Sequence, residues 1–205
     1  MLVGMAVVRK VAAAILLMAA PLLAQVRATA SGAPAAATGP VFQASAGYTY
    51  LLMGTPSQPQ TALNGVDGAA LLDLTSHWGL TADASYVRTG DVFATSHSGN
   101  VISLLAGPVL YPASWRKTRI FVRGLAGVGW VNSAVPVTDH YYLGGSVVRF
   151  SYAMGGGVEQ IVSGRLSVRA GCDYLRTAFA NPSGAIEPQN NLRMVGSIVY
   201  RFGKR

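Results

Sequence analysis

Residues 192–202 read LRMVGSIVYRF, and apolar side chains alternate with polar ones along this segment. The apolar set is Leu192, Met194, Ile198, Tyr200 and Phe202, and the polar set is Arg193, Ser197 and Arg201. Successive side chains of a β-strand point to opposite faces, so a period of two is typical of a strand with one apolar face. The C-terminal segment is therefore predicted to be a strand with one apolar and one charged face.

The same alternation returns in six upstream segments. It is clear in residues 119–130, 148–159 and 165–176, and weaker but consistent in residues 42–52, 66–74 and 80–86. An eighth segment, residues 101–111, is apolar almost throughout and contains Pro108. Proline removes a ladder donor and a closed sheet has no edge strand to hold it, so we expect Pro108 near the end of its strand. The pattern predicts eight strands.

The expected connections between these strands alternate in length. Longer segments are expected at residues 54–64, 90–100, 132–145 and 179–190, and shorter ones near residues 76–79, 112–118 and 162–164. Short turns at one end and longer loops at the other are typical of a membrane barrel with both termini in the periplasm. We therefore expect four outward loops.

The N-terminus has the features of a secretory signal peptide. Arg9 and Lys10 precede an apolar run at residues 11–24, and small residues follow at Ala24, Ala28 and Ala30. The run is shorter than the roughly 20 residues that a spanning helix needs. We expect residues 1–30 to be removed by cleavage between about 24 and 30, residues 31–40 to form a short periplasmic leader, and residues 41–205 to form a single barrel domain.

Composition is consistent with strands that cross a membrane. Charged residues make up only 12% of the chain, and no apolar run after the signal reaches helix-spanning length. Within hydrocarbon, only helices and closed barrels satisfy every backbone polar group. The 16 Lys and Arg outnumber the 8 Asp and Glu, but they are spread through the strand-like segments and never form a run, so we do not expect nucleic acid as a partner. The predicted fold is all-β, an eight-stranded antiparallel up-and-down transmembrane barrel.

The charged face could line the lumen or, in a soluble lipocalin-like barrel, face water. The lumen is favoured because glycines share the charged face and aromatic residues of the other face cluster near strand ends, as in the girdles of membrane barrels. Buried charges must be paired, so we expect a structural ion-pair network. The expected lumen residues are Asp67, Asp73, Asp83, Arg119, Arg123, Arg149, Glu159, Arg165, Arg169, Asp173, Arg193 and Arg201.

Residues 41–205 resemble the small outer-membrane barrels of the OmpA transmembrane-domain and OmpX type. The most specific feature is the terminal strand GSIVYRF, with Ile198, Tyr200 and Phe202 at alternate positions. The resemblance implies a monomer in the outer membrane of a Gram-negative cell envelope, surrounded by lipid and lipopolysaccharide. It also implies that these three residues form an assembly signal read by the barrel-insertion machinery. The chain departs from the family because Gly203, Lys204 and Arg205 follow Phe202, whereas in many family members the aromatic residue is the last one.

Function is less constrained than fold. We expect a structural and surface-interaction role with a filled lumen, because eight strands leave an interior that side chains can fill. A narrow, porin-like pore and a lipid-modifying barrel enzyme are the alternatives. Ser96, His97 and Ser98 lie in a polar segment and are residue types used in nucleophilic catalysis, but nothing near in sequence fixes the geometry that a serine, a histidine and an orienting carboxylate need. We expect no enzymatic activity, no cofactor and no metal, and Cys172 as a small apolar side chain.

Overall fold

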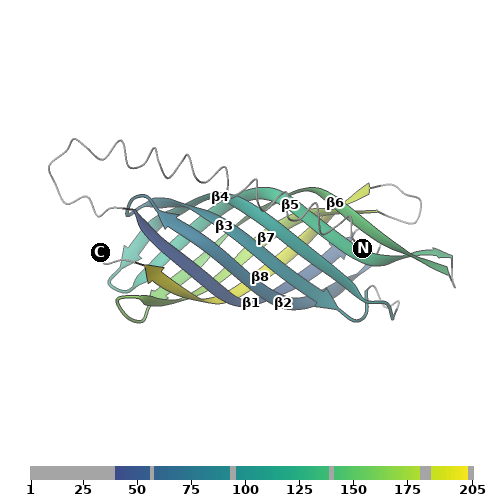
Figure 1. Cartoon of the computed structure of the whole chain (residues 1–205), viewed down its shortest axis with the longest axis horizontal. Coiled ribbons are helices and arrows are strands. Elements are labelled where there is room, and N and C mark those ends of the chain that lie inside the picture. Colours follow the sequence, from purple (N-terminus) through teal and green to yellow (C-terminus); the bar gives the residue numbers. More distant parts are fainter. Residues whose placement is uncertain (1–39, 56–57, 93–95, 139–140, 181–185, 203–205) are drawn as a thin grey trace. The chain divides into compact units, whose positions relative to one another are not determined.

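The computed structural model describes residues 40–55, 58–92, 96–138, 141–180 and 186–202. Within them, eight antiparallel strands close into a barrel in sequence order, as the alternation predicted (Figure 1). The strands are β1 (Val41–Thr55), β2 (Gln58–Asp73), β3 (Trp78–Thr89), β4 (Gly99–Trp115), β5 (Thr118–Thr138), β6 (Tyr141–Ile161), β7 (Leu166–Ala180) and β8 (Ile186–Phe202). No described helix is long and apolar enough to cross a membrane. The expected signal peptide and leader lie outside the described residues.

The first and last strands close the barrel. Their pairing runs without interruption from Phe42↔Phe202 to Leu52↔Leu192. A slip of one residue would turn every side chain of a strand to the opposite face, so this continuous register fixes which residues face inward. Even-numbered residues of β8, such as Ile198, are exposed, whereas Arg193 is fully buried. The interior therefore receives the polar set of the C-terminal segment.

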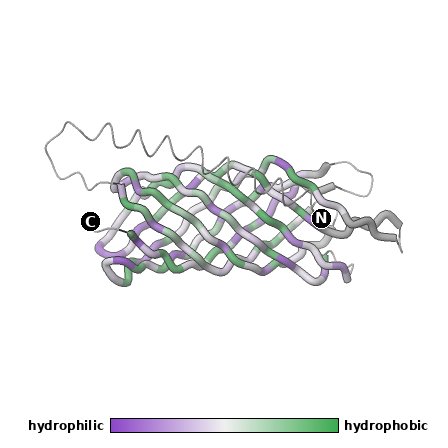
Figure 2. Tube along the Cα trace, in the orientation of Figure 1, coloured by the Kyte–Doolittle hydropathy of each residue, from purple (hydrophilic) through white to green (hydrophobic). Residues whose placement is uncertain are grey.

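The outer wall of the barrel is apolar. Figure 2 shows hydrophobic and hydrophilic residues alternating along the strands, as the register requires. Large side chains exposed on this wall include Tyr48, Val66, Phe150, Met154, Val168 and Ile198. Soluble monomers rarely expose apolar surface of this extent. The wall therefore suits a hydrocarbon environment rather than water.

Pro108 lies inside β4, seven positions before the strand ends at Trp115, so its expected place near the strand end is wrong. Its Cα partner on β3 is Leu80. On the other side, the β4–β5 register is interrupted after Ala106↔Ala126 and resumes at Val109↔Arg123. The missing amide hydrogen therefore disturbs one short stretch of one ladder, and the closed barrel holds the strand in place on both sides.

Much of three expected loops is strand in the structure. Residues 54–55 and 58–64 belong to the ends of β1 and β2, and residues 132–138 and 141–145 belong to the outer parts of β5 and β6. Within the expected loop at 179–190, residues 179–180 belong to β7 and residues 186–190 to β8. At 21 residues each, β5 and β6 extend beyond their neighbours at the loop end of the barrel (Figure 1). Small and polar residues are compatible with a loop and equally with a strand ladder that extends beyond the hydrocarbon. Composition alone therefore misplaces the ends of these strands.

Candidate functional site

The centre of the barrel holds a cluster of five charged side chains, called here the central cluster: Asp67, Asp83, Arg123, Asp173 and Arg193. Arg193 Nη1 donates to Asp83 Oδ1 at 2.7 Å, and its Nη2 donates to Asp173 Oδ2 at 2.8 Å. Arg123 repeats this arrangement, at 3.2 Å from Asp83 and 2.6 Å from Asp173. Two guanidinium groups and two carboxylates thus alternate, and Asp67 lies 4.0 Å from Arg193.

A second layer of charge lies closer to the short turns. Asp73 accepts hydrogen bonds from Gln43 at 2.6 Å and Tyr111 at 2.9 Å, and it pairs with Arg119 at 3.2 Å. The Arg119 guanidinium also stacks over the Tyr111 ring, 3.6 Å from its centroid. These contacts join β1, β2, β4 and β5 across the interior. Removing one partner would leave a desolvated charge behind.

Glu159 organises the other half of this layer. Its two carboxylate oxygens pair with Arg169 at 2.6 Å and Arg201 at 3.3 Å. Arg169 also lies over the Phe121 ring, at 4.9 Å from the centroid. A carboxylate held by two guanidinium groups is a strong arrangement, because both hydrogen bonds are charge-assisted. This group links β6, β7 and β8.

Between the central cluster and the loops, the interior is apolar. On four strands the buried apolar residue follows the charged one toward the loop end: Leu63 after Asp67 on β2, Val87 after Asp83 on β3, Leu125 after Arg123 on β5, and Leu175 after Asp173 on β7. The contiguous set, called here the apolar layer, is Leu51, Met53, Leu63, Val87, Val92, Val101, Leu105, Leu125, Val131, Ala153 and Leu175. Each is at most 3% exposed, so the layer is packed.

Little free space remains in the described interior around the charged layers. A void lined by residues that include Asp67, Phe121, Arg123 and Arg169 has a volume of about 10 Å³. That volume is at the lower limit for a single water molecule. Paired charges and the apolar layer thus fill the middle of the barrel with side chains, as expected for eight strands.

Solved structures with the same architecture come from bacterial outer membranes. Ail of Yersinia pestis matches with a TM-score of 0.57 at 15% identity, over 80% of this chain and 100% of Ail. Neisserial surface protein A matches with a TM-score of 0.64 at 9% identity, over 78% of this chain and 97% of that protein. OprG of Pseudomonas aeruginosa matches with a TM-score of 0.51 at 10% identity, over 80% of this chain and 96% of OprG. This chain has the fold of the small outer-membrane β-barrels.

At these low sequence identities, the structural similarity concerns the fold alone and does not extend to a shared activity. No protein-family model and no curated protein sequence matches the chain. The chain covers nearly the whole length of each of these three structures, so the likeness concerns an entire barrel. What the barrel does must therefore be argued from its own interior and surfaces.

Ten of the twelve residues that the sequence assigned to the barrel lumen are buried in the interior, and Arg149 and Arg165 are exposed. Arg165 lies in the turn before β7, where its Nη1 is 3.5 Å from the Tyr200 hydroxyl. Arg149 lies on β6 beyond the last β6–β7 pair, Tyr152↔Arg176, so none of the described residues of β7 pairs with β6 at that position. Alternation placed both residues on the inward-facing side of the sheet. It does not show at which residue the barrel stops enclosing an interior.

The apolar layer was not predicted from the sequence. Its members lie on the same inward-facing side of their strands as the charged residues. Because the outward-facing side chains of these segments are apolar too, no alternation of polar and apolar residues marks them. Leu51 and Met53 follow Thr49 at steps of two, which is the signal that could have revealed them. Gln43 and Tyr111 were also missed as partners of Asp73, because the contacts span 30 and 38 residues of sequence.

The residues of the expected assembly signal share the outer face of β8. Phe202 packs against Phe42 of β1, with ring centroids 5.4 Å apart, and against Tyr200 at 4.8 Å. Ile198, at 62% exposure, continues this face. The aromatic rings therefore pack at the barrel closure. Recognition of these residues by the insertion machinery stays a prediction.

The polar loop that contains Ser96 and His97 is organised by hydrogen bonds from backbone amides. The Ser96 amide donates to Asp91 Oδ1 at 2.8 Å, and the Val92 amide donates to the His97 carbonyl oxygen at 2.9 Å. Among the residues that the structure describes, no three His, Cys, Asp or Glu side chains form a group able to hold a metal ion. Cys172 is exposed on the outer wall.

Proposed function

We propose that this protein is a closed barrel of the Gram-negative outer membrane with a structural and surface-interaction role. The supporting observation is a side-chain-filled interior enclosed by an apolar wall. An outer membrane location would follow cleavage of the N-terminal signal, and a closed sheet with no free edge favours a monomer. We propose no enzymatic activity and no cofactor.

The interior supports a structural role because its ion pairs connect strands that are far apart in sequence. Arg193 and Asp83 are separated by 110 residues, and Arg123 and Asp173 by 50. Such pairs form only when the whole barrel has closed in the correct register. They favour one closed arrangement over slipped ones, since a slip would leave desolvated charges unpaired.

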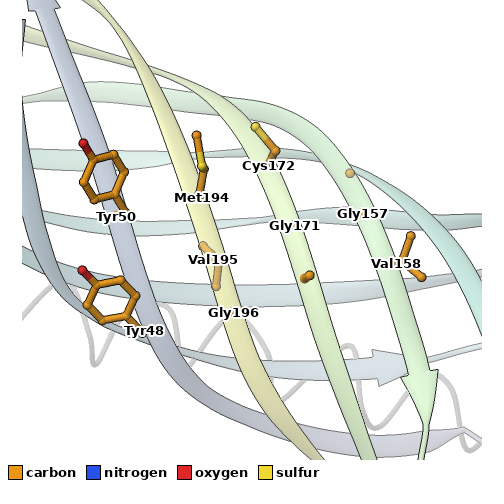
Figure 3. Close-up of a pocket in the computed structure, with 11 residues that line it drawn as sticks. Tyr48, Tyr50, Gly157, Val158, Gly171, Cys172, Met194, Val195 and Gly196 are labelled. Carbon is orange, nitrogen blue, oxygen red and sulfur yellow. The ribbon is translucent and has the colours of Figure 1, made fainter.

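Lipid and lipopolysaccharide are the proposed partners of the outer wall. A groove of about 620 Å³ runs over the outer face of β6, β7, β8 and β1. Its apolar lining includes Tyr48, Val158, Cys172, Met194 and Gly196 (Figure 3). Its lining suits acyl chains. At the loop end, exposed Arg88 and Arg176 would lie at the level of lipopolysaccharide phosphates. Ail has been solved in complex with the heparin analogue sucrose octasulfate, another polyanion.

Planar bilayers distinguish this proposal from the narrow pore. The purified protein should give no steady conductance, because an ion would have to cross the apolar layer and displace the paired charges of the central cluster. An open porin inserted into the same bilayer serves as the positive control. A stable single-channel current from the protein would support the pore and remove the closed-barrel role.

Orientation is tested separately with an inserted protease site. A site placed after Ser98, in the segment between β3 and β4, should be cut on intact cells, because that end is expected to face outward. The matched insertion after Ser163, in the turn between β6 and β7, should be protected until the outer membrane is permeabilised. The reverse pattern would invert the barrel, and cutting of both sites in a soluble fraction would favour a secreted barrel.

A further inference from the structure

The turn end of the barrel carries exposed positive charge that the proposed function does not use. Arg116 and Lys117 form the two-residue turn between β4 and β5, and Arg165 lies in the turn between β6 and β7. All three side chains are exposed. Among the acids whose side chains the structure describes, only Asp91 is exposed, and it lies in the loop at the opposite end. The turn end is therefore cationic.

A groove of about 660 Å³ lies beside the β4–β5 turn, lined by Trp115, Arg116, Lys117, Thr118 and Gln160. These five residues are called here the turn-end surface. The Lys117 carbonyl oxygen accepts a hydrogen bond from the Ile161 amide at 2.7 Å, which ties the turn to the end of β6. Thr118 Oγ1 donates to Gln160 Oε1 at 2.7 Å. This bond leaves the Gln160 amide group free to donate.

The turn-end surface combines the groups that hold a phosphodiester at a membrane interface. No described carboxylate forms an ion pair with Arg116 or Lys117, so both cations can accept an external anion. An arginine fork, a lysine ammonium and an amide N–H all donate to phosphate oxygens. Trp115, at 59% exposure, has the amphipathic ring that is enriched at the headgroup level of membranes.

We infer that the turn-end surface docks the headgroup of an anionic phospholipid in the leaflet that borders the turns, an inference that rests on the proposed function. The position decides between possible anions. The β4–β5 turn follows the exposed apolar side chains Leu110 on β4 and Val122 on β5, so a bilayer around this wall would place the groove at the level of its lipid phosphates. A soluble polyanion would have no need of the exposed indole beside the cations.

The backbone supplies a clean variant for the test. Arg116 has a φ of 47°, in the left-handed region that favours glycine and asparagine. Arg116→Asn therefore removes the charge without adding strain, and Lys117→Gln removes the second charge of the turn. The matched control is Arg149→Gln, which removes an exposed charge of β6 at the opposite end, where no binding role is proposed for it.

Trp115 can report on its own lipid neighbours. The chain has three tryptophans, so Trp78→Phe with Trp130→Phe leaves Trp115 as the single tryptophan, whose indole is excited apart from the tyrosines. Protein purified from membranes is reconstituted in phosphatidylcholine vesicles with a minor fraction of phosphatidylglycerol, and brominated forms of either lipid quench the indole. In this background we expect a preference for brominated phosphatidylglycerol of about five-fold, falling with added salt.

Neutralising the β4–β5 turn should bring this preference close to one, whereas the loop-end control should retain it. Equal quenching by the two lipids in the parent protein would overturn the inference, as would equal loss in the control. Displacement of the lipid by soluble peptidoglycan fragments would assign the surface to the cell wall instead. Heat-modifiable migration on gels, followed in the same samples, reports insertion. A barrel that fails to insert contradicts the proposed function itself.

Discussion

Replacing Arg193 with alanine is expected to lower the free energy of unfolding by about 3 to 5 kcal/mol. Arg193 is fully buried and donates to Asp83 and Asp173, with Asp67 at 4.0 Å. Without it, three carboxylates would share the remaining guanidinium of Arg123. Removing one partner of a buried pair is costly because the charge that stays behind has lost both its attraction and its water. Urea titration of the barrel refolded into lipid vesicles measures the change.

The matched control for Arg193→Ala is Arg165→Ala. Both residues had the same inward assignment from sequence, but Arg165 is exposed in a turn and should cost less than about 0.5 kcal/mol. Adding Asp83→Asn to Arg193→Ala removes one stranded carboxylate, so the double variant should lose less than the sum of the single ones. An effect of Arg193→Ala as small as that of Arg165→Ala would contradict the network described for the interior.

Local periodicity was sufficient to predict strands and their faces. The alternation in residues 192–202 set the parity of Arg193 and Arg201, and both side chains are buried. This succeeds because each strand meets two different environments, one on each side, and carries the difference in its own sequence. The confirmed barrel follows once eight such segments must satisfy their backbone groups together.

The sequence alone does not show how charged and apolar side chains are arranged in layers along the barrel axis. The partners of Asp73 come from β1, β4 and β5, and no single strand shows which of them will face it. The apolar layer is hidden for the same reason, since Leu105 in an apolar strand gives no sign that Leu51 and Leu125 belong to the same cluster. Strand ends are also ambiguous, because the ladder continues past the point where alternation fades.

Replacing Ala170 with arginine is the second change with a large expected effect, and it tests the environment of the outer wall. Ala170 is exposed on β7, between Leu166, which pairs with Tyr200 near the turns, and Tyr174 toward the loops. It therefore lies near the middle of the apolar wall. An arginine at the midplane of a bilayer should cost about 2 to 4 kcal/mol in the same vesicle titration.

Ala170→Leu is the matched control, because it adds apolar volume at the same exposed position without charge. It should leave the free energy of unfolding nearly unchanged, since the side chain would only replace lipid contacts. Val168→Arg, two residues closer to the turns, should cost less than Ala170→Arg because a long side chain can reach the interface from there. In water, all three variants would be tolerated equally. A stable Ala170→Arg barrel would therefore remove the hydrocarbon assignment of this wall, whereas a cost that rises toward the middle of β7 is the behaviour that only a bilayer around the barrel explains.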